Sequence, residues 1–156
     1  MDINTNIYNL EQVDYSQRGQ TVEVIVEGIP KRQTIIFSGI DCFGNTYYFT
    51  EQGLRYIADS RNERPEQKLV LNYLDKIPVI LNAPLIIGRN LKKPENFLYF
   101  QEVAIRERRY QKFLFNVVLK KSNINVVWNF YYLSENKVPK KVDIIYRTRG
   151  SARYFR

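Results

Sequence analysis

The spacing of apolar residues changes at Pro84, and this change limits the folds that the chain can adopt. Before Pro84, residues 51–60 and 65–77 carry apolar side chains at helical spacing, which predicts two consecutive helices. After Pro84, apolar residues follow a period of two, as they do in strands. Helices followed by a run of strands favour the α+β class.

Five strands are expected after Pro84, over residues 85–89, 97–106, 110–120, 125–133 and 142–148. The turn between the third and the fourth of these strands is short enough for an antiparallel hairpin. We therefore expect two consecutive helices packed on one face of an antiparallel sheet of about four to five strands.

A small β-hairpin region is expected before the helices, with strands over 20–27, 33–37 and 46–49. The turn sequence DCFGN at 41–45 predicts that the second and third of these strands form a hairpin. A chain of 156 residues suits one domain of ordinary size. The expected organisation is an N-terminal extension over 1–19, a single α+β domain over 20–148 and a basic C-terminal tail over 149–156.

The chain is strongly basic, with 24 Lys and Arg against 16 Asp and Glu and a net charge of +8. An excess of this size favours a polyanionic partner, and nucleic acid is the obvious one because each neutralised phosphate releases a counterion. The alternative is a basic domain whose charges are only solvated. Apolar runs are too short for a membrane span and the first residues lack a signal-peptide pattern, so we expect a cytoplasmic protein without a membrane partner.

Histidine is absent from the sequence, and Cys42 is the one cysteine. This composition excludes an internal disulfide, histidine general bases and Ser-His or Cys-His nucleophile arrangements. Any catalysis must therefore use Lys, Arg, Tyr, Asp or Glu. No glycine-rich phosphate loop occurs, and no cofactor is expected. Cys42 is interpreted as a small residue near a turn.

Basic residues interleave with aromatic residues on and around the expected sheet, a combination that single-strand and RNA binders use to hold phosphates and stack bases. The alternative is that the basic residues are solvated or guard sheet edges, while the aromatic residues pack in the core. The candidate nucleic-acid-binding residues are Arg55, Arg89, Arg106, Arg108, Arg109, Lys120, Lys121, Trp128, Tyr131, Arg147 and Arg149.

A metal-free ribonuclease needs cations on the phosphate and groups that move protons to and from the reacting oxygens. If the first helix docks beside the strands, the residues that can line such a cleft are Arg55, Tyr56, Arg61, Arg89, Tyr99, Lys112, Asn129 and Tyr131. If the protein is a metal-free ribonuclease, Arg61, Arg89 and Arg106 are expected to bind phosphate.

A metal-dependent endonuclease is the more distant alternative. It requires Glu102, Glu107 or Asp59 to converge on Mg²⁺, with Lys112 nearby. The spacing of these carboxylates matches no compact motif, and a solvated face explains them better. No metal site is therefore expected.

The order of elements between residues 44 and 133 resembles the phage-associated branch of the barnase/EndoU/colicin/RelE-type nuclease superfamily. The pieces that carry the resemblance are Tyr47-Tyr48-Phe49-Thr50, Leu54-Arg55-Tyr56-Ile57 and Ile77-Pro78, followed by the long strands. The resemblance implies a nuclease-like protein of mobile-element origin that acts on RNA.

The chain departs from this family at both catalytic histidines, because Tyr56 stands at the first position and Arg61 or Asn62 at the second. The resemblance therefore implies either a non-cleaving member or the tyrosine, lysine and arginine chemistry of the RelE-type branch. It makes Tyr56, Arg61 and Lys112 the candidate catalytic residues, with Tyr56 and Lys112 on proton transfer or charge stabilisation. For Tyr56 the alternative is core packing of the first helix.

Three functions stay open on the sequence. The first is a hydrolase, a metal-independent endoribonuclease that is active or has decayed, and the second is a nucleic-acid-binding module without activity. The third is a protein-binding factor of immunity type, whose basic face meets an acidic partner.

Overall fold

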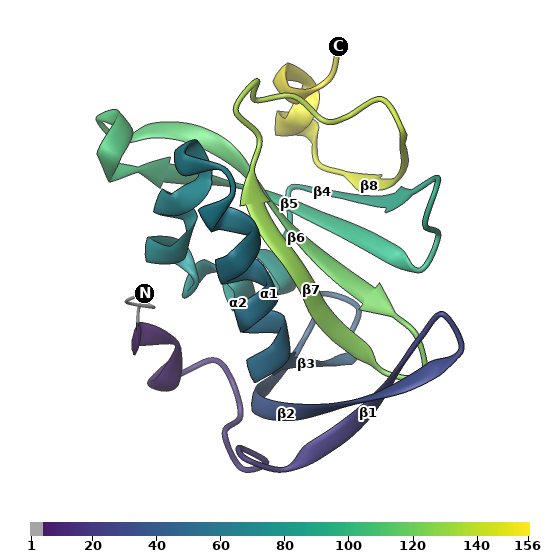
Figure 1. The fold of residues 1–156 in the computed structure, drawn as a ribbon. Helices are drawn as coiled ribbons and strands as arrows, with labels where there is room; N and C mark the ends of the chain where they lie inside the picture. Colours follow the sequence, from purple (N-terminus) through teal and green to yellow (C-terminus); the bar gives the residue numbers. More distant parts are fainter. Residues whose placement is uncertain (1–4) are drawn as a thin grey trace.

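The computed structural model describes residues 5–156, which form one mixed sheet with the helices of residues 51–82 on one side (Figure 1). The order of the described strands is β1-β2-β3-β7-β6-β5-β4-β8. The elements are η1 (Thr5–Tyr8), β1 (Thr21–Val26), β2 (Ile29–Ile40), β3 (Thr46–Thr50), α1 (Glu51–Asn62), η2 (Pro65–Tyr73), α2 (Lys76–Asn82), β4 (Ile86–Asn90), β5 (Asn96–Ile105), η3 (Arg106–Arg108), β6 (Gln111–Lys121), β7 (Asn125–Tyr132), β8 (Val142–Arg147) and η4 (Arg149–Tyr154).

The expected sheet of about four to five antiparallel strands, with a separate hairpin region before it, is wrong. The described residues form a single eight-stranded sheet, because β3 pairs in parallel with β7 at Tyr47↔Asn125 and Tyr48↔Val126. This pairing joins the β1–β2–β3 region to the later strands. It connects residues that lie far apart in the sequence, so it leaves no trace in local periodicity.

The second helix also differs from the expectation. Residues 65–73 form the 3₁₀-helix η2, and the α-helix α2 begins only at Lys76 and continues through Pro78. Pro78 is the third residue of α2, where a backbone N–H has no partner within the helix, so the ring removes no hydrogen bond. By contrast, α1 begins where Thr50 caps it, and the Thr50 side chain accepts a hydrogen bond from the Gly53 N–H.

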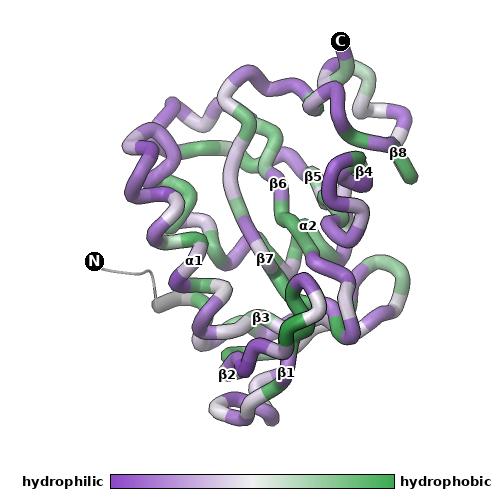
Figure 2. Tube along the Cα trace, turned by 45° about the vertical axis from the view of Figure 1, so that its right-hand side comes forward, coloured by the Kyte–Doolittle hydropathy of each residue, from purple (hydrophilic) through white to green (hydrophobic). Residues whose placement is uncertain are grey.

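Two hydrophobic clusters lie on opposite faces of the sheet. The larger one fills the space between the helices and the sheet, and it includes Ile57, Leu74 and Phe115. The smaller one lies beneath the C-terminal segment and includes Leu114 and Tyr154. Figure 2 shows hydrophobic positions in the central strands and hydrophilic positions in the loops between them. The alternation of side chains along each strand supplies both clusters.

β3 pairs only with the first two residues of β7. Along the rest of that edge, side chains form the hydrogen bonds to the β7 backbone that a neighbouring strand would otherwise form. The Arg61 Nη1 donates to the Phe130 carbonyl at 3.3 Å. The Gln67 amide donates to the Tyr132 carbonyl at 2.9 Å and accepts from the Tyr132 N–H at 3.1 Å. These bonds satisfy the backbone groups of β7 and hold the end of α1 and the start of η2 against it.

The start of α1 approaches β7 so closely that Gly53 is required there. A Cβ at this position would lie 2.9 Å from the Val127 carbonyl oxygen, which is backbone and has little freedom to move. The absence of a side chain at Gly53 therefore sets the distance between α1 and β7, and with it the place of Tyr56 and Arg61.

Candidate functional site

Two cavities meet along β7 beside α1, and together they are called the β7 groove. The first, the arginine pocket, has a volume of about 500 Å³ and lies at the end of α1. The second, the lysine pocket, has a volume of about 390 Å³ and lies between β7 and the loops that follow β4 and precede β8. Tyr56, Asn129 and Tyr131 line both pockets, so the two cavities share a wall.

The β7 groove is lined by more cations than carboxylates. Arg61 and Arg64 line the arginine pocket, together with Glu63, which is the one acidic residue of its lining. Lysines alone supply the charge of the other pocket, from Lys92, Lys93 and Lys141. This balance favours an anionic ligand.

Arg61 is buried without a counter-ion. Its exposed fraction is 7%, and within the described chain it forms no ion pair. Its one hydrogen bond runs to the Phe130 carbonyl, and its Nε has no hydrogen-bond partner. Burial lowers the pKa of Arg61, and the neighbouring charge of Arg64 lowers it further. A buried cation in this position is stabilised by any anion that reaches the pocket.

Two aromatic side chains lie where the pockets adjoin: Tyr56 lines both pockets, and Trp128 lines the lysine pocket. The Tyr56 and Trp128 ring centroids are 6.1 Å apart, and Tyr56 is 49% exposed. The Lys120 ammonium lies 4.8 Å from the centre of the Trp128 ring and 3.4 Å from the Glu95 carboxylate, so its charge is matched within the protein. Trp128 therefore packs beside Tyr56, and both rings present surface to the groove.

Buried amides lie in the groove and next to it. Asn116 is fully buried and donates from Nδ2 to the Tyr131 hydroxyl at 2.9 Å, while its Oδ1 has no hydrogen-bond partner. Burial raises the pKa of Tyr131. Asn96, which lines the lysine pocket and is 7% exposed, also has an Oδ1 without a partner. Unpaired polar atoms inside a protein are uncommon, and three of the four found among the described residues, those of Arg61, Asn96 and Asn116, belong to residues that line this groove or contact its lining.

The structure brings five of the sequence-predicted site residues together, and one of them, Asn129, lines both pockets. Tyr56, Arg61 and Tyr131 line the arginine pocket, and Trp128 lines the lysine pocket. Lys120 contacts the Trp128 ring but lines neither pocket. Tyr99, which was expected in the cleft, points to the helix-covered face instead, where its hydroxyl donates to Asp41 at 3.1 Å.

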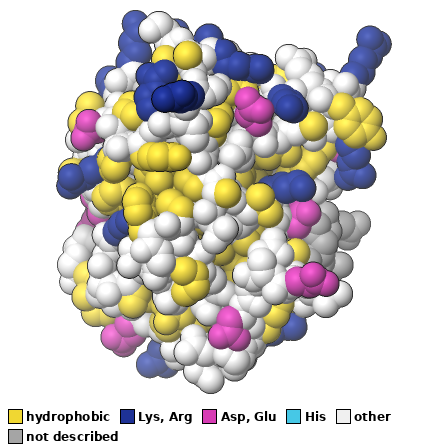
Figure 3. Space-filling view, turned by 180° about the vertical axis from the view of Figure 1, so that it is seen from behind, with side chains coloured by type: hydrophobic (Ala, Val, Ile, Leu, Met, Phe, Trp, Pro, Cys, Tyr) yellow, Lys and Arg dark blue, Asp and Glu magenta, His cyan; other side chains and the backbone are white. Residues whose placement is uncertain are grey.

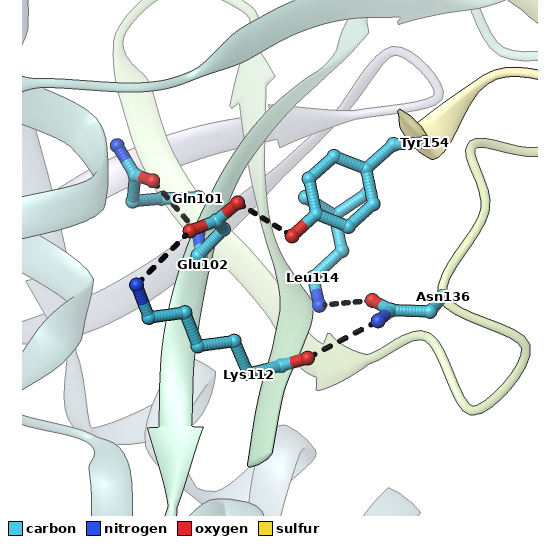
Figure 4. Close-up of polar contacts among 6 residues, drawn as sticks. All are labelled: Gln101, Glu102, Lys112, Leu114, Asn136 and Tyr154. Carbon is cyan, nitrogen blue, oxygen red and sulfur yellow. Dashed lines mark hydrogen bonds and ion pairs between the residues drawn. The ribbon is translucent and has the colours of Figure 1, made fainter. Parts of the chain in front are cut away.

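Lys112 lies outside the groove and lines neither of its pockets. Its ammonium is 3.9 Å from the Glu102 carboxylate, which also accepts a hydrogen bond from the Tyr154 hydroxyl at 2.6 Å (Figure 4). Burial raises the pKa of Tyr154, and the contact with Glu102 raises it further. The expected set of Tyr56, Arg61 and Lys112 is therefore not assembled at one place.

The remaining basic candidates are spread over the surface. Three of them lie against rings, with Arg89 and Lys121 on Phe97 and Arg147 on Phe155. The others are exposed and line neither pocket of the groove, namely Arg55, Arg106, Arg108, Arg109 and Arg149. These residues add to the net charge without forming a common site.

Several residues of the groove were not predicted from the sequence as site residues: Arg64, Lys92, Lys93, Asn96 and Lys141. Arg64 follows Arg61 by three residues at a helix end, and this spacing was a usable signal. The lysines carried no such signal, because their two loops meet only in the fold, where the Leu91 N–H donates to the Lys141 carbonyl at 3.3 Å.

The carboxylates considered for Mg²⁺ do not converge. Glu102 binds Tyr154 and Lys112, whereas Glu107 accepts a hydrogen bond from the Tyr73 hydroxyl at 2.8 Å. Over residues 5–156, no group of three or more Cys, Asp or Glu side chains is placed to hold a metal ion. In the same range, no helix is long and apolar enough to cross a membrane.

Comparison of the chain with family models, with curated proteins and with solved structures finds no match in any of the three, so the β7 groove itself carries the functional argument.

Proposed function

We propose that this protein binds nucleic acid, with RNA favoured, through the β7 groove. The observation that carries the proposal is Arg61, a guanidinium that is 7% exposed, has no ion pair in the described chain and lines the larger pocket. A phosphate at this pocket would supply the missing negative charge and accept charge-assisted hydrogen bonds from the guanidinium.

The rest of the groove supports the same ligand. Arg64 adds a second cation beside Arg61, and the lysines of the other pocket extend the positive charge along β7. Tyr56 offers an exposed ring between the two pockets. Cations that follow a backbone, interrupted by aromatic surface, are the combination that binds single-stranded nucleic acids. The resemblance to RNA-cleaving nucleases favours RNA over DNA.

Binding is proposed in preference to cleavage because the groove lacks part of the expected catalytic set. Lys112 lies beside Glu102, outside both pockets. Burial raises the pKa of Tyr131 and so moves this phenol further from a role as a base near neutral pH. Cleavage of RNA is therefore treated as a separate outcome of the test.

The test measures the affinity of the purified protein for a labelled RNA at about 50 and about 200 mM salt, with and without EDTA. We expect binding that weakens steeply as salt rises. Arg61→Gln is expected to weaken binding at least tenfold, or about 1.4 kcal/mol, while Arg61→Lys retains part of the affinity. Arg55→Gln is the matched control, because Arg55 lies on the same helix, is exposed and lines neither pocket.

Equal affinities of the Arg61→Gln and Arg55→Gln proteins would contradict the proposal. Cleavage that survives EDTA and needs Tyr56 would revive the metal-free ribonuclease. Absence of any RNA binding would instead favour a protein partner. Figure 3, which views the molecule from behind, shows hydrophobic side chains gathered on that side, and such a surface suits a protein contact better than a polyanion.

A further inference from the structure

The two pockets of the β7 groove differ in chemistry although they share a wall. The arginine pocket offers guanidinium groups from Arg61 and Arg64. The lysine pocket has a mixed lining, in which the apolar side chains of Leu98, Val118 and Trp128 lie among amides and lysines. A pocket that combines apolar surface with a few placed polar groups suits a flat, partly apolar ring system.

The polar groups of the lysine pocket are amides. Asn96 is buried to more than nine tenths, and its Oδ1 has no hydrogen-bond partner. Asn129 uses its Oδ1 to accept a hydrogen bond from the Phe130 N–H at 2.8 Å, which leaves its amide nitrogen as the group that can donate. Asparagine side chains of this kind pair with the edges of nucleobases, which carry donors and acceptors side by side.

A nucleotide with its base in one pocket and its phosphate in the other would cross the wall that the two pockets share. Tyr56 lines both pockets, is 49% exposed and packs beside Trp128 at 6.1 Å between ring centroids. A base in the lysine pocket can therefore lie against the Tyr56 ring, while the adjoining phosphate reaches the Arg61 side of the same ring. Stacking of a base on an aromatic side chain contributes affinity without selecting one base.

We propose that the lysine pocket holds an unpaired nucleobase while Arg61 and Arg64 hold the adjoining phosphate, so that the ligand is a single strand. This assignment rests on the nucleic-acid-binding function proposed above and narrows its ligand class. A base inside a duplex has its hydrogen-bonding edge paired and its faces stacked, so it cannot enter the pocket without leaving the helix.

The test compares four competitors against the same labelled RNA: the single strand, its duplex, the same strand with abasic positions, and inorganic polyphosphate. The single strand should compete at least tenfold better than each of the other three. Trp128 is the single tryptophan of the chain and lies in the lysine pocket, so its fluorescence reports occupancy directly. Its emission should change with base-containing strands and not with polyphosphate.

Variants of the groove residues distinguish the contribution of the base to the binding affinity from that of the phosphate. Tyr56→Leu should weaken binding of the intact strand about fivefold or more and leave polyphosphate binding unchanged, whereas Tyr56→Phe should retain the affinity. Asn96→Leu should likewise weaken binding of the intact strand and leave polyphosphate binding unchanged. Tyr110→Leu is the control, because Tyr110 is 68% exposed and lines neither pocket of the groove.

Equal competition by the intact and the abasic strand would overturn the base pocket while leaving the proposed function standing. The same holds if the duplex competes as well as the single strand, or if Tyr56→Leu binds the intact strand normally. Failure of both the single strand and polyphosphate to bind would instead overturn the proposed function.

Discussion

Two groups of polar side chains beside the sheet differ in whether their charges are matched within the protein. Around Glu102, the carboxylate accepts a hydrogen bond from Tyr154 and lies 3.9 Å from the Lys112 ammonium. Around Arg61, the guanidinium is 7% exposed and has no ion pair among the described residues. The Glu102 group thus joins the C-terminal segment to the sheet, whereas the Arg61 group leaves charge available to a ligand.

The difference between the Glu102 group and the Arg61 group shows which polar residues to assign to function. A tyrosine, a glutamate and a lysine in contact look like a catalytic cluster, yet each of them already has its partner in the protein. Unmatched polar groups inside a protein destabilise it unless something else compensates, so they are the better indicator of a binding site. Mutation of Arg61 should therefore weaken binding with little effect on stability, whereas mutation of Glu102 should lower stability with little effect on binding.

The largest effect is expected from Arg61→Met on RNA affinity, with a loss of tenfold to a hundredfold, or about 1.4 to 2.7 kcal/mol. The free energy of unfolding should change by less than about 1 kcal/mol, because relief of the buried charge offsets the lost hydrogen bond to Phe130. Chemical denaturation and RNA titration of the same protein check both values. A loss of stability as large as the loss of binding would show that Arg61 is a structural residue.

Glu102→Ala should behave in the opposite way. The Tyr154 hydroxyl is then left in a buried position without its acceptor, and we expect the free energy of unfolding to fall by about 1 to 3 kcal/mol. RNA affinity should stay within about twofold of the parent, since Glu102 lines neither pocket of the groove. Weakened RNA binding by this variant at a temperature where it is fully folded would break the distinction between the two groups.

Gly53→Ala tests how the groove is assembled. The added Cβ would lie 2.9 Å from the Val127 carbonyl oxygen, so α1 must move away from β7. We expect a loss of about 1 to 2 kcal/mol in stability, together with weaker RNA binding, because Tyr56 and Arg61 move with the helix. Gly150→Ala is the matched control, since nothing lies within 4 Å of a Cβ built there. Equal melting temperatures for the two variants would contradict the close approach.

The smallest effect concerns pH. Burial and the Glu102 contact raise the pKa of Tyr154 above its ordinary value of 10.0, so the folded state prefers the neutral phenol. The resulting stabilisation is fully present below pH 10 and is lost as pH rises through the higher pKa of the folded state. Tyr154→Phe should therefore reduce stability by about 1 kcal/mol at neutral pH and make its decline at alkaline pH shallower. Parallel pH profiles for the two proteins would argue against the contact.

Much of the secondary structure could be predicted because it depends on neighbouring residues. The helix expected over 51–60 is α1, since Thr50 caps it and apolar residues recur at helical spacing. The hairpins β2–β3 and β6–β7 form where turn sequences separate two strands. The assembly of the sheet could not be predicted in this way, because the parallel pairing of β3 with β7 depends on residues far apart in the chain.

The residues of the candidate site also divide into those that local sequence predicted and those that only the fold brings together. Tyr56 and Arg61 were predicted from one helix, and Trp128 and Tyr131 from one strand, and these elements do form the groove. Lys112 was placed with them on the strength of its residue type and strand, but it lies with Glu102 instead. Asn96 and Lys141 carried no local signal, and only the folded chain brings them to β7.

By itself, then, the sequence determined the basic charge, the absence of histidine chemistry and the identity of most helices and strands, because these properties reside in composition and in local spacing. Tertiary structure alone decided which cations share a pocket and which are neutralised by a neighbour. Arg61 and Lys112 are both basic residues of the same chain, but α1 buries one against β7 without a counter-ion while the pairing of β5 with β6 brings the other to Glu102. Whether a charge remains free for a ligand depends on burial and on partners that lie far away in the sequence.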